Sequence, residues 1–120
     1  MTKELSKVPD VEIDPEGIFP YILVDVTAKS GHSKCIVRGD CFSEYHSDVY
    51  DKTIPKIKAQ GFDCRVMGGG KIDHRGSKKE ILVYGYSGNY GEAEHTITCA
   101  VLRKKYKDYD KITHRKQNFY

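Results

Sequence analysis

The chain has 120 residues, of which 38% are hydrophobic and 31% charged, and its formal net charge is +3. This length suits one compact domain with a single core, so we expect residues 1–120 to form one domain. The mild positive charge favours an anionic substrate. The sequence lacks the concentrated basic stripe of a nucleic-acid-binding protein, so we expect no nucleic-acid partner.

No apolar run approaches the roughly 18 residues that a membrane span needs, and the first five residues lack the apolar core of a signal peptide. We therefore expect a cytoplasmic protein that acts as a monomer and has no membrane partner. The four cysteines show no framework spacing, which favours reduced thiols over disulfides. They are Cys35, Cys41, Cys64 and Cys99.

The strongest strand signal lies at residues 18–27, which are rich in β-branched and aromatic side chains. Pro20 cannot donate a ladder hydrogen bond, so we expect this end of the strand to lie at an edge or among the strand's first residues. The continuous apolar character of residues 81–84 predicts a central strand. Shorter strands are expected at 11–14, 34–39, 62–67 running on into 71–74, and 108–113.

A first helix is expected at residues 46–60, followed by Gly61 as a C′ cap. Its imperfect apolar stripe consists of Val49, Ile54 and Ile57. Pro55 removes one hydrogen bond and clashes with the preceding turn, at a cost of about 3 kcal/mol. We therefore expect the helix to kink at Pro55, or to break and restart there.

A second helix is expected at residues 91–106. Its predicted apolar face consists of Ala93, Ile97, Ala100 and Val101. His95 and Cys99 lie one turn apart on this helix, a spacing that can bind metal. Since no second pair of ligands lies nearby, we expect no metal site. The sequence identifies no partner for His32, His74 or His114.

His46 lies between the strand expected at 34–39 and the first helix. Ligands bind at such junctions because backbone N–H groups there are unpaired and point outward. A histidine titrates near neutrality, so it can carry protons or attack an electrophile. Arg38, at the end of the strand, could reach the same place and hold a phosphate bidentately. The alternative is an ordinary surface or core histidine.

Two glycine-rich stretches also point to a phosphate site. The run from Gly68 to Lys71 is not a P-loop, because Arg65 stands where the first glycine is needed and Ile72 where Ser or Thr is needed. Three consecutive glycines suit a bulge or a place where a ligand comes close. A purely structural role for these glycines is the alternative.

The second stretch is the turn Ser87-Gly88-Asn89, which glycines flank and which the second helix is expected to follow directly. Successive free N–H groups and a helix dipole together make an anion site. The alternative is a connection that only changes the direction of the chain. The sequence contains neither a C-x5-R phosphatase loop nor a G-x-S-x-G nucleophile elbow.

Several motifs, spread in one order over almost the whole chain, resemble the protein-histidine phosphatase family of small janus/ocnus-like proteins. They are residues 8–14 (VPDVEID) with Gly17, 36–39 (IVRG), 44–52 (EYHSDVYDK), 60–61 (QG), 68–72 (GGGKI) and 83–87 (VYGYS). The family fold agrees with the elements expected above. It implies a single α/β (α+β) domain, in which a mixed sheet of about six strands has a helix on each side.

The resemblance also implies a reaction and a site. The reaction is hydrolysis of the P–N bond of phosphohistidine in protein substrates, without a metal or another cofactor. The catalytic histidine of the E-Y-H-x-D motif corresponds to His46, which would act as proton acceptor or as nucleophile. The phosphate-binding positions correspond to Arg38, Lys71, Ser87, Gly88 and Asn89.

One departure from the family pattern concerns Pro20. Many members carry a lysine between two aromatic residues (F-K-Y), where it helps to bind substrate, whereas this chain has Phe19-Pro20-Tyr21. Losing one cation near a dianion costs about 1–3 kcal/mol of binding, which Lys71 and Arg38 could offset. The alternative function is therefore a non-catalytic janus-like phosphoprotein-binding or sex-regulated protein with reduced or absent turnover.

Overall fold

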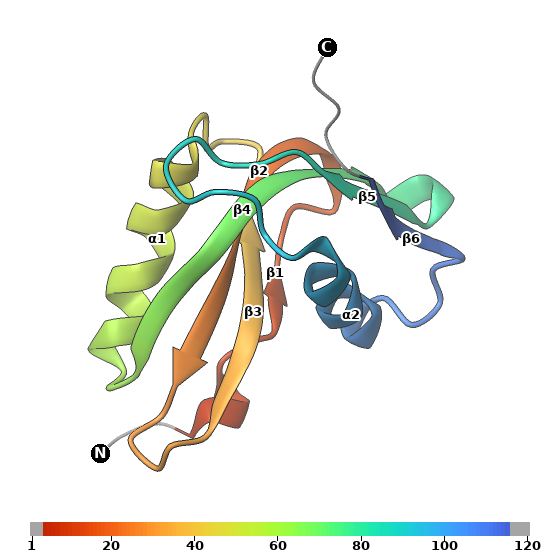
Figure 1. The fold of residues 1–120 in the computed structure, drawn as a ribbon. Coiled ribbons are helices and arrows are strands. Elements are labelled where there is room, and N and C mark those ends of the chain that lie inside the picture. The colour runs from red at the N-terminus through yellow and green to blue at the C-terminus, as the bar shows by residue number, and fades with distance from the viewer. Residues whose placement is uncertain (1–3, 116–120) are drawn as a thin grey trace.

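The computed structural model describes residues 4–115, which form a six-stranded mixed sheet with one helix on each face (Figure 1). The strands are β1 (Val11–Glu12), β2 (Glu16–Thr27), β3 (Ser33–Gly39), β4 (Asp63–Arg75), β5 (Glu80–Tyr84) and β6 (Lys111–His114). The helices are α1 (His46–Ala59) and α2 (His95–Lys105), with short 3-10 turns η1 (Leu5–Lys7) and η2 (Gly76–Lys78). The expected fold class is confirmed.

The strand order is β1-β3-β2-β4-β5-β6. The two outermost pairs, β1 with β3 and β5 with β6, are parallel, and the three inner pairs are antiparallel. The strand expected to be central, β5, lies one strand from an edge, and β2 and β4 occupy the centre instead. The continuous apolar run of β5 reflects burial under α2 on one face and the neighbours β4 and β6 beside it.

β2 supplies both cores because its alternate side chains point to opposite faces of the sheet. Ile22, Val24 and Val26 pack with α1, and Phe19, Tyr21 and Leu23 pack with α2. Pro20 lies one residue beyond the last β2–β3 pair, Tyr21 with Gly39, so β2 has a ladder partner there only on the β4 side. This agrees with the edge environment expected for the proline.

The strands expected at 62–67 and 71–74 are one continuous strand, β4, which runs through the three glycines. Its register with β2 shifts between Leu23 and Val24, which pair with Gly68 and Val66, so a β-bulge lies at this point. Gly68 has φ of +141°, a conformation that favours glycine. The bulge that the glycine run suggested is therefore present.

α1 is uninterrupted from His46 to Ala59 although Pro55 lies inside it, so the helix does not break and restart. Buried residues on both sides of the proline hold the two halves on the sheet, and this packing offsets the missing hydrogen bond. They are Val49, Thr53, Ile54 and Ile57. Gly61, with φ of +93°, follows the C-cap residue Gln60 in the expected C′ position.

α2 begins at His95, four residues later than expected, because residues 91–93 are extended and pair with β4. Gly69 donates its N–H to Gly91 O and accepts from the N–H of Ala93, each at 3.0 Å. The predicted apolar face was also wrong in part, since Ile97 is 38% exposed and Ala100 is exposed. The buried residues of α2 are His95, Thr98, Cys99, Val101 and Leu102.

All four cysteines are free thiols, as the sequence predicted. Among residues 4–115, neither helix is long and apolar enough to cross a membrane.

Candidate active site

His46 is the first residue of α1 and lies half-buried against the glycine run of β4. The start of the helix is fixed by Asp48, whose carboxylate accepts the backbone N–H of Glu44 at 3.1 Å and that of Tyr45 at 2.9 Å. This arrangement satisfies donors that a helix leaves free at its N-terminus. Because the position of His46 follows directly from this cap, its ring is presented at a defined place above β4.

The ring orientation of His46 is set by Gly70. Nε2 of His46 lies 2.8 Å from the carbonyl oxygen of Gly70. A carbonyl oxygen only accepts, so Nε2 carries the proton and, in the neutral ring, Nδ1 carries the lone pair. Among residues 4–115 nothing hydrogen-bonds to Nδ1. The structure therefore leaves one basic nitrogen of His46 free to react.

Gly69 brings His46 and Ser87 together. A Cβ atom at Gly69 would lie 2.8 Å from Cδ2 of His46, 3.2 Å from Cβ of Ser87 and 2.7 Å from the backbone oxygen of Tyr21. Only glycine fits at such distances. The histidine and the serine, 41 positions apart in the sequence, thus lie on either side of one glycine.

The loop of residues 85–91 is anchored across the bulge of β4. Ser87 and Gly91 exchange backbone hydrogen bonds of 3.1 and 2.8 Å. The Ser87 hydroxyl oxygen is buried and accepts the N–H groups of Asn89, at 3.3 Å, and Tyr90, at 3.1 Å. These two amides therefore close a serine turn rather than point into open space. Since α2 starts only at His95, the turn is not the helix N-terminus that the sequence suggested.

Several donors of this loop have no acceptor in the part of the chain that the structure describes. Among the described residues, neither the N–H of Gly88 nor the hydroxyl proton of Ser87 has an acceptor. Gly88 is exposed, and a Cβ added to it would meet nothing within 4 Å. Asn89 is exposed as well, with its N–H directed to Ser87. The donors of this loop that lack an acceptor among residues 4–115 thus include the Gly88 N–H, the hydroxyl of the buried Ser87 and the side-chain amide of Asn89.

Lys71 lies on the His46 side of the sheet. Side chains two positions apart on a strand share a face, so Lys71 projects on the same side as Gly69. Lys71 is exposed, pairs with Pro20 of β2 and Tyr84 of β5, and forms no ion pair among residues 4–115. The position at which many family members carry lysine is thus directly opposite Lys71. In this chain the uncharged Pro20 occupies it.

Arg38 is not brought to His46. It pairs with Ile22, and β3 lies on the far side of β2 from β4. Its guanidinium donates from Nη2 to Pro9 O at 2.8 Å and from Nη1 to Val37 O at 3.0 Å. Nη2 also lies 3.7 Å from Glu12. Burial lowers the pKa of Arg38, while the charge of Glu12 acts in the opposite direction.

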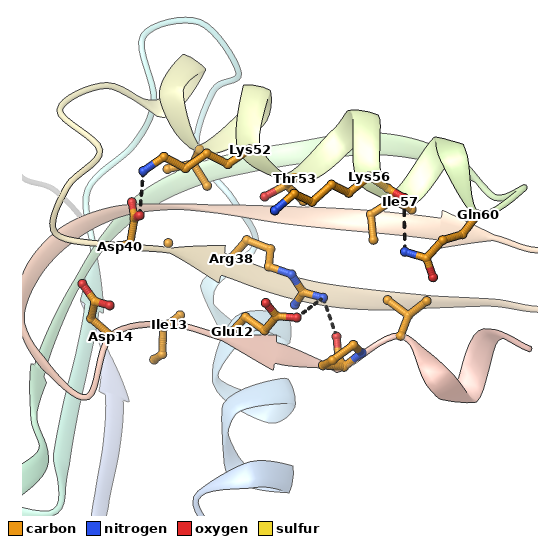
Figure 2. A pocket seen from close by; sticks show the side chains of 14 residues that line it. Glu12, Ile13, Asp14, Arg38, Asp40, Lys52, Thr53, Lys56, Ile57 and Gln60 are labelled. Carbon is orange, nitrogen blue, oxygen red and sulfur yellow. Dashed lines mark hydrogen bonds and ion pairs between the residues drawn. The ribbon is translucent and has the colours of Figure 1, made fainter. Parts of the chain in front are cut away.

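The guanidinium of Arg38 instead lines a pocket of about 340 Å³ between β1, β3 and α1, which His46 does not line (Figure 2). Across this pocket, Lys52 of α1 forms a 2.7 Å ion pair with Asp40 (Figure 2). Arg38 therefore connects the β1 segment to the sheet, and the group that the sequence placed beside the phosphate lies in a separate pocket.

A buried network that the sequence did not reveal lies under the glycine run, on the α2 face. His95 donates its Nε2–H to Gly85 O at 3.0 Å, and in the neutral ring its Nδ1 accepts the Tyr21 hydroxyl at 2.8 Å. Tyr21 also bonds to Thr98 at 3.0 Å. Burial raises the pKa of the Tyr21 phenol. Because Tyr21 is 74 positions from His95, sequence spacing could not show this contact.

The remaining histidines have other roles. His74 is buried, with Nδ1 donating to Asp14 O at 2.7 Å and Nε2 2.8 Å from the hydroxyl of Tyr109. His32 is exposed and lies 3.0 Å from Ser30 Oγ. Among residues 4–115 no group of three or more His, Cys, Asp or Glu side chains is placed to hold a metal ion.

Fold and site together define a small α+β protein in which one histidine with a free Nδ1 and a serine turn lie against the same glycine of a glycine-rich strand. The family model of the Janus/Ocnus family matches residues 5–110, so the chain belongs to this family. The resemblance inferred from the motifs is thereby confirmed.

Relatives within this family carry two kinds of name. A 14 kDa phosphohistidine phosphatase of Sus scrofa is 45% identical over 112 residues, covering 88% of this chain and 89% of the relative. The Homo sapiens protein of the same name is 44% identical over 113 residues, covering 89% and 90%. The sex-regulated protein janus-A of Drosophila pseudoobscura pseudoobscura is 45% identical over 113 residues, covering 90% and 76%.

Proposed function

We propose that this chain is a protein-histidine phosphatase that hydrolyses the P–N bond of phosphohistidine in protein substrates, with His46 as the reacting residue. The observation that carries the proposal is the Nε2–H bond of His46 to Gly70, which leaves the Nδ1 lone pair free on a ring whose Cδ2 edge lies next to Gly69, the glycine that also adjoins Ser87. Relatives about 45% identical over most of the chain are named phosphohistidine phosphatase, which supports the same reaction.

The reaction requires mainly that the phosphoryl group is positioned and its charge is stabilised. Imidazole is a good leaving group from phosphorus once its nitrogen is protonated, and phosphoryl transfer depends mainly on holding the phosphoryl group in line. The Ser87 hydroxyl and the Gly88 N–H would hold phosphoryl oxygens, and the Lys71 ammonium would neutralise charge. Water or Nδ1 of His46 supplies the nucleophile, so the proposal needs no metal or cofactor.

Two routes share this geometry. In the first, Nδ1 of His46 takes a proton from water while the water oxygen bonds to phosphorus and the P–N bond breaks. The substrate imidazole, already protonated from solvent at its other ring nitrogen, leaves as neutral imidazole. In the second, Nδ1 itself bonds to phosphorus, the substrate imidazole leaves, and water then cleaves the phosphorylated His46. Only the second route forms a covalent enzyme intermediate, so trapping distinguishes them.

The test is turnover of phosphoramidate and of a histidine-phosphorylated peptide by wild type and by His46→Ala. We expect His46→Ala to abolish both activities, and the matched control His32→Ala, at an exposed site, to retain them. An acid-labile phosphoryl label on His46 after rapid quenching would select the covalent route. Full activity of the His46→Ala protein would remove His46 from the reaction and with it this proposal.

Pro20 favours a second candidate, a non-catalytic janus-like phosphoprotein-binding protein. Pro20 lies opposite Lys71, so the site has one cation fewer than the family pattern provides. Comparison of wild type with Pro20→Lys decides between the two functions. Binding of a phosphohistidine peptide without release of phosphate, in both proteins, would support the binding protein. Release that Pro20→Lys increases and His46→Ala abolishes would support the enzyme.

We further propose that the protein acts as a monomer in the cytoplasm. The four free thiols support this location, since reduced cysteines are typical of a reducing compartment. Sedimentation of the purified protein and fractionation of cells that express it check the two statements.

A further inference from the structure

The face of the sheet that carries His46 is covered by α1 over only part of its length. α1 packs with residues 22–26 of β2 and with residues 62–66, which include the start of β4. The opposite ends of these two strands, residues 16–20 and 71–75, extend beyond it toward β5 and β6 (Figure 1). Ile18 is 59% exposed there, which shows that the described residues leave this part of the face open.

The strand register arranges the side chains of this open face in three rows. The first row, nearest His46, consists of Pro20, Lys71 and Tyr84. The second consists of Ile18, Asp73, Leu82 and Thr113. The third consists of Glu16, Arg75, Glu80 and Lys111. Residues directly opposite each other on neighbouring strands point to the same side, so all three rows face the side of His46.

The open face has a definite shape and charge pattern. A hollow of about 180 Å³ lies over β4, β5 and β6, lined by second- and third-row residues that include Leu82 and Lys111. Arg75 is paired with Asp73 at 3.2 Å. Lys71 and Lys111 form no ion pair among residues 4–115. An apolar surface of Ile18 and Leu82 thus lies between Lys71 in the first row and Lys111 in the third, where Glu80 stands opposite Lys111 without an ion pair between them.

We propose that this open face binds the polypeptide segment that flanks the phosphohistidine of a protein substrate. The inference rests on the proposed function, because the first row of the face belongs to that site through Lys71. An extended segment advances about 3.3 Å per residue, so about four to six residues reach from His46 to the third row. An apolar side chain of the substrate packs on Ile18 and Leu82, and a carboxylate beyond it binds Lys111.

The proposal predicts that peptide substrates contact the open face, whereas a small substrate does not. Phosphoramidate fills only the phosphoryl site and does not reach the second or third row. A phosphohistidine peptide with leucine and glutamate two to six residues from the histidine gains contacts that the same peptide with serine at those positions lacks. We expect wild type to prefer the leucine/glutamate peptide over the serine peptide by about tenfold in kcat/KM.

The experiment measures kcat/KM for phosphoramidate and for both peptides in wild type, Ile18→Asp, Lys111→Glu and Ile97→Asp. Ile97 is 38% exposed on α2, at the opposite side of the sheet, and is the matched control. We expect Ile18→Asp and Lys111→Glu to lower kcat/KM for the leucine/glutamate peptide by about five- to tenfold. Turnover of phosphoramidate should stay within about twofold of wild type, and Ile97→Asp should change neither.

The kcat/KM lost in Lys111→Glu should be recovered on a peptide in which lysine replaces glutamate. A variant that had merely unfolded would not recover it. The proposal is overturned if wild type shows no preference between the peptides, or if Ile18→Asp lowers phosphoramidate turnover equally. A dimer that Ile18→Asp dissociates, with unchanged kinetics, would assign the face to a second copy instead. Wild-type phosphoramidate turnover that depends on His46 tests the proposed function separately, so the two failures are distinguishable.

Discussion

Nε2 of His46 donates to the carbonyl oxygen of Gly70 at 2.8 Å, and this single contact decides which nitrogen of the ring can react. Gly70 itself is packed tightly between β5 and α2. A Cβ at Gly70 would lie 2.5 Å from Tyr84 O on β5 and 3.0 Å from Cε1 of His95 on α2. The glycine run therefore serves the site by letting backbone and imidazole approach each other.

Gly69→Ala tests this close approach. The added methyl group would lie 2.7 Å from the backbone oxygen of Tyr21 and 2.8 Å from Cδ2 of His46, so the ring has to move. We expect a loss of about 1–3 kcal/mol in the free energy of unfolding and about a hundredfold loss in kcat for phosphoramidate. Urea denaturation and steady-state kinetics measure the two effects.

Gly31→Ala is the control for Gly69→Ala. Gly31 has φ of +96° in an exposed turn, and a Cβ there would meet nothing within 4 Å. This variant should lose stability through backbone strain and keep its kcat. An unchanged kcat in Gly69→Ala would show that the position of the His46 ring does not limit the reaction.

Arg38→Gln should act on stability rather than on substrate binding. The substitution leaves the carbonyls of Pro9 and Val37 with weaker donors in a buried place, at a cost of about 1–3 kcal/mol in the free energy of unfolding. KM for phosphoramidate should stay close to wild type.

Lys71→Met, at an exposed position, should leave the free energy of unfolding unchanged and raise KM for phosphoramidate about tenfold.

The kinetic comparison of these two variants decides the role of Arg38. A selective rise of KM in Arg38→Gln, without a loss of stability, would return Arg38 to the phosphate site that the sequence suggested.

Tyr21→Phe tests the network beneath the glycine run. It removes a buried hydroxyl that serves both His95 and Thr98, so we expect a loss of about 1–3 kcal/mol in the free energy of unfolding. His95 should then hold Gly85 less rigidly, and hydrogen exchange of the backbone amides in residues 85–91 should become faster. Thr98→Val removes only the hydrogen bond between Tyr21 and Thr98 and keeps the one between Tyr21 and His95. Hydrogen exchange in residues 85–91 should therefore stay nearer to wild type.

Asp40 gives a pH-dependent contribution to stability. Burial by itself would raise its pKa, but hydrogen bonds from Lys52 and Ser43 lower the pKa below its ordinary value. A carboxylate with a lowered folded-state pKa stabilises the protein above its unfolded pKa of about 3.9. This contribution is lost as the pH falls through the folded-state pKa.

Asp40→Asn checks the sign of this effect. The variant should be less stable than wild type at pH 7, and the difference should shrink as the pH falls below about 4. Urea denaturation at both pH values measures it. A difference that grows at low pH would contradict the assignment of the ion pair between Asp40 and Lys52 as the cause.

Local pattern and short-range chemistry determined much of this fold. The β-branched run of β2, the apolar stripe of α1 and the C′ role of Gly61 depend on residues close together in the sequence. The junction that places His46 at the start of α1 is local as well, since Asp48 caps the helix through the N–H groups of Glu44 and Tyr45, four and three residues before it. These features were predictable because propensity and capping act over a few residues.

Tertiary structure decided what depends on strand order. Only the placement of β3 beyond β2 shows that Arg38 lies away from His46, although the two are eight residues apart in the sequence. Because residues 91–93 pair with β4, α2 begins only at His95, and the buried face of the helix differs in part from the predicted one. The contact of Tyr21 with His95 and the alignment of Pro20 with Lys71 arise from the same sheet. No local pattern encodes such contacts, because the hydrogen-bonded register between distant strands fixes them.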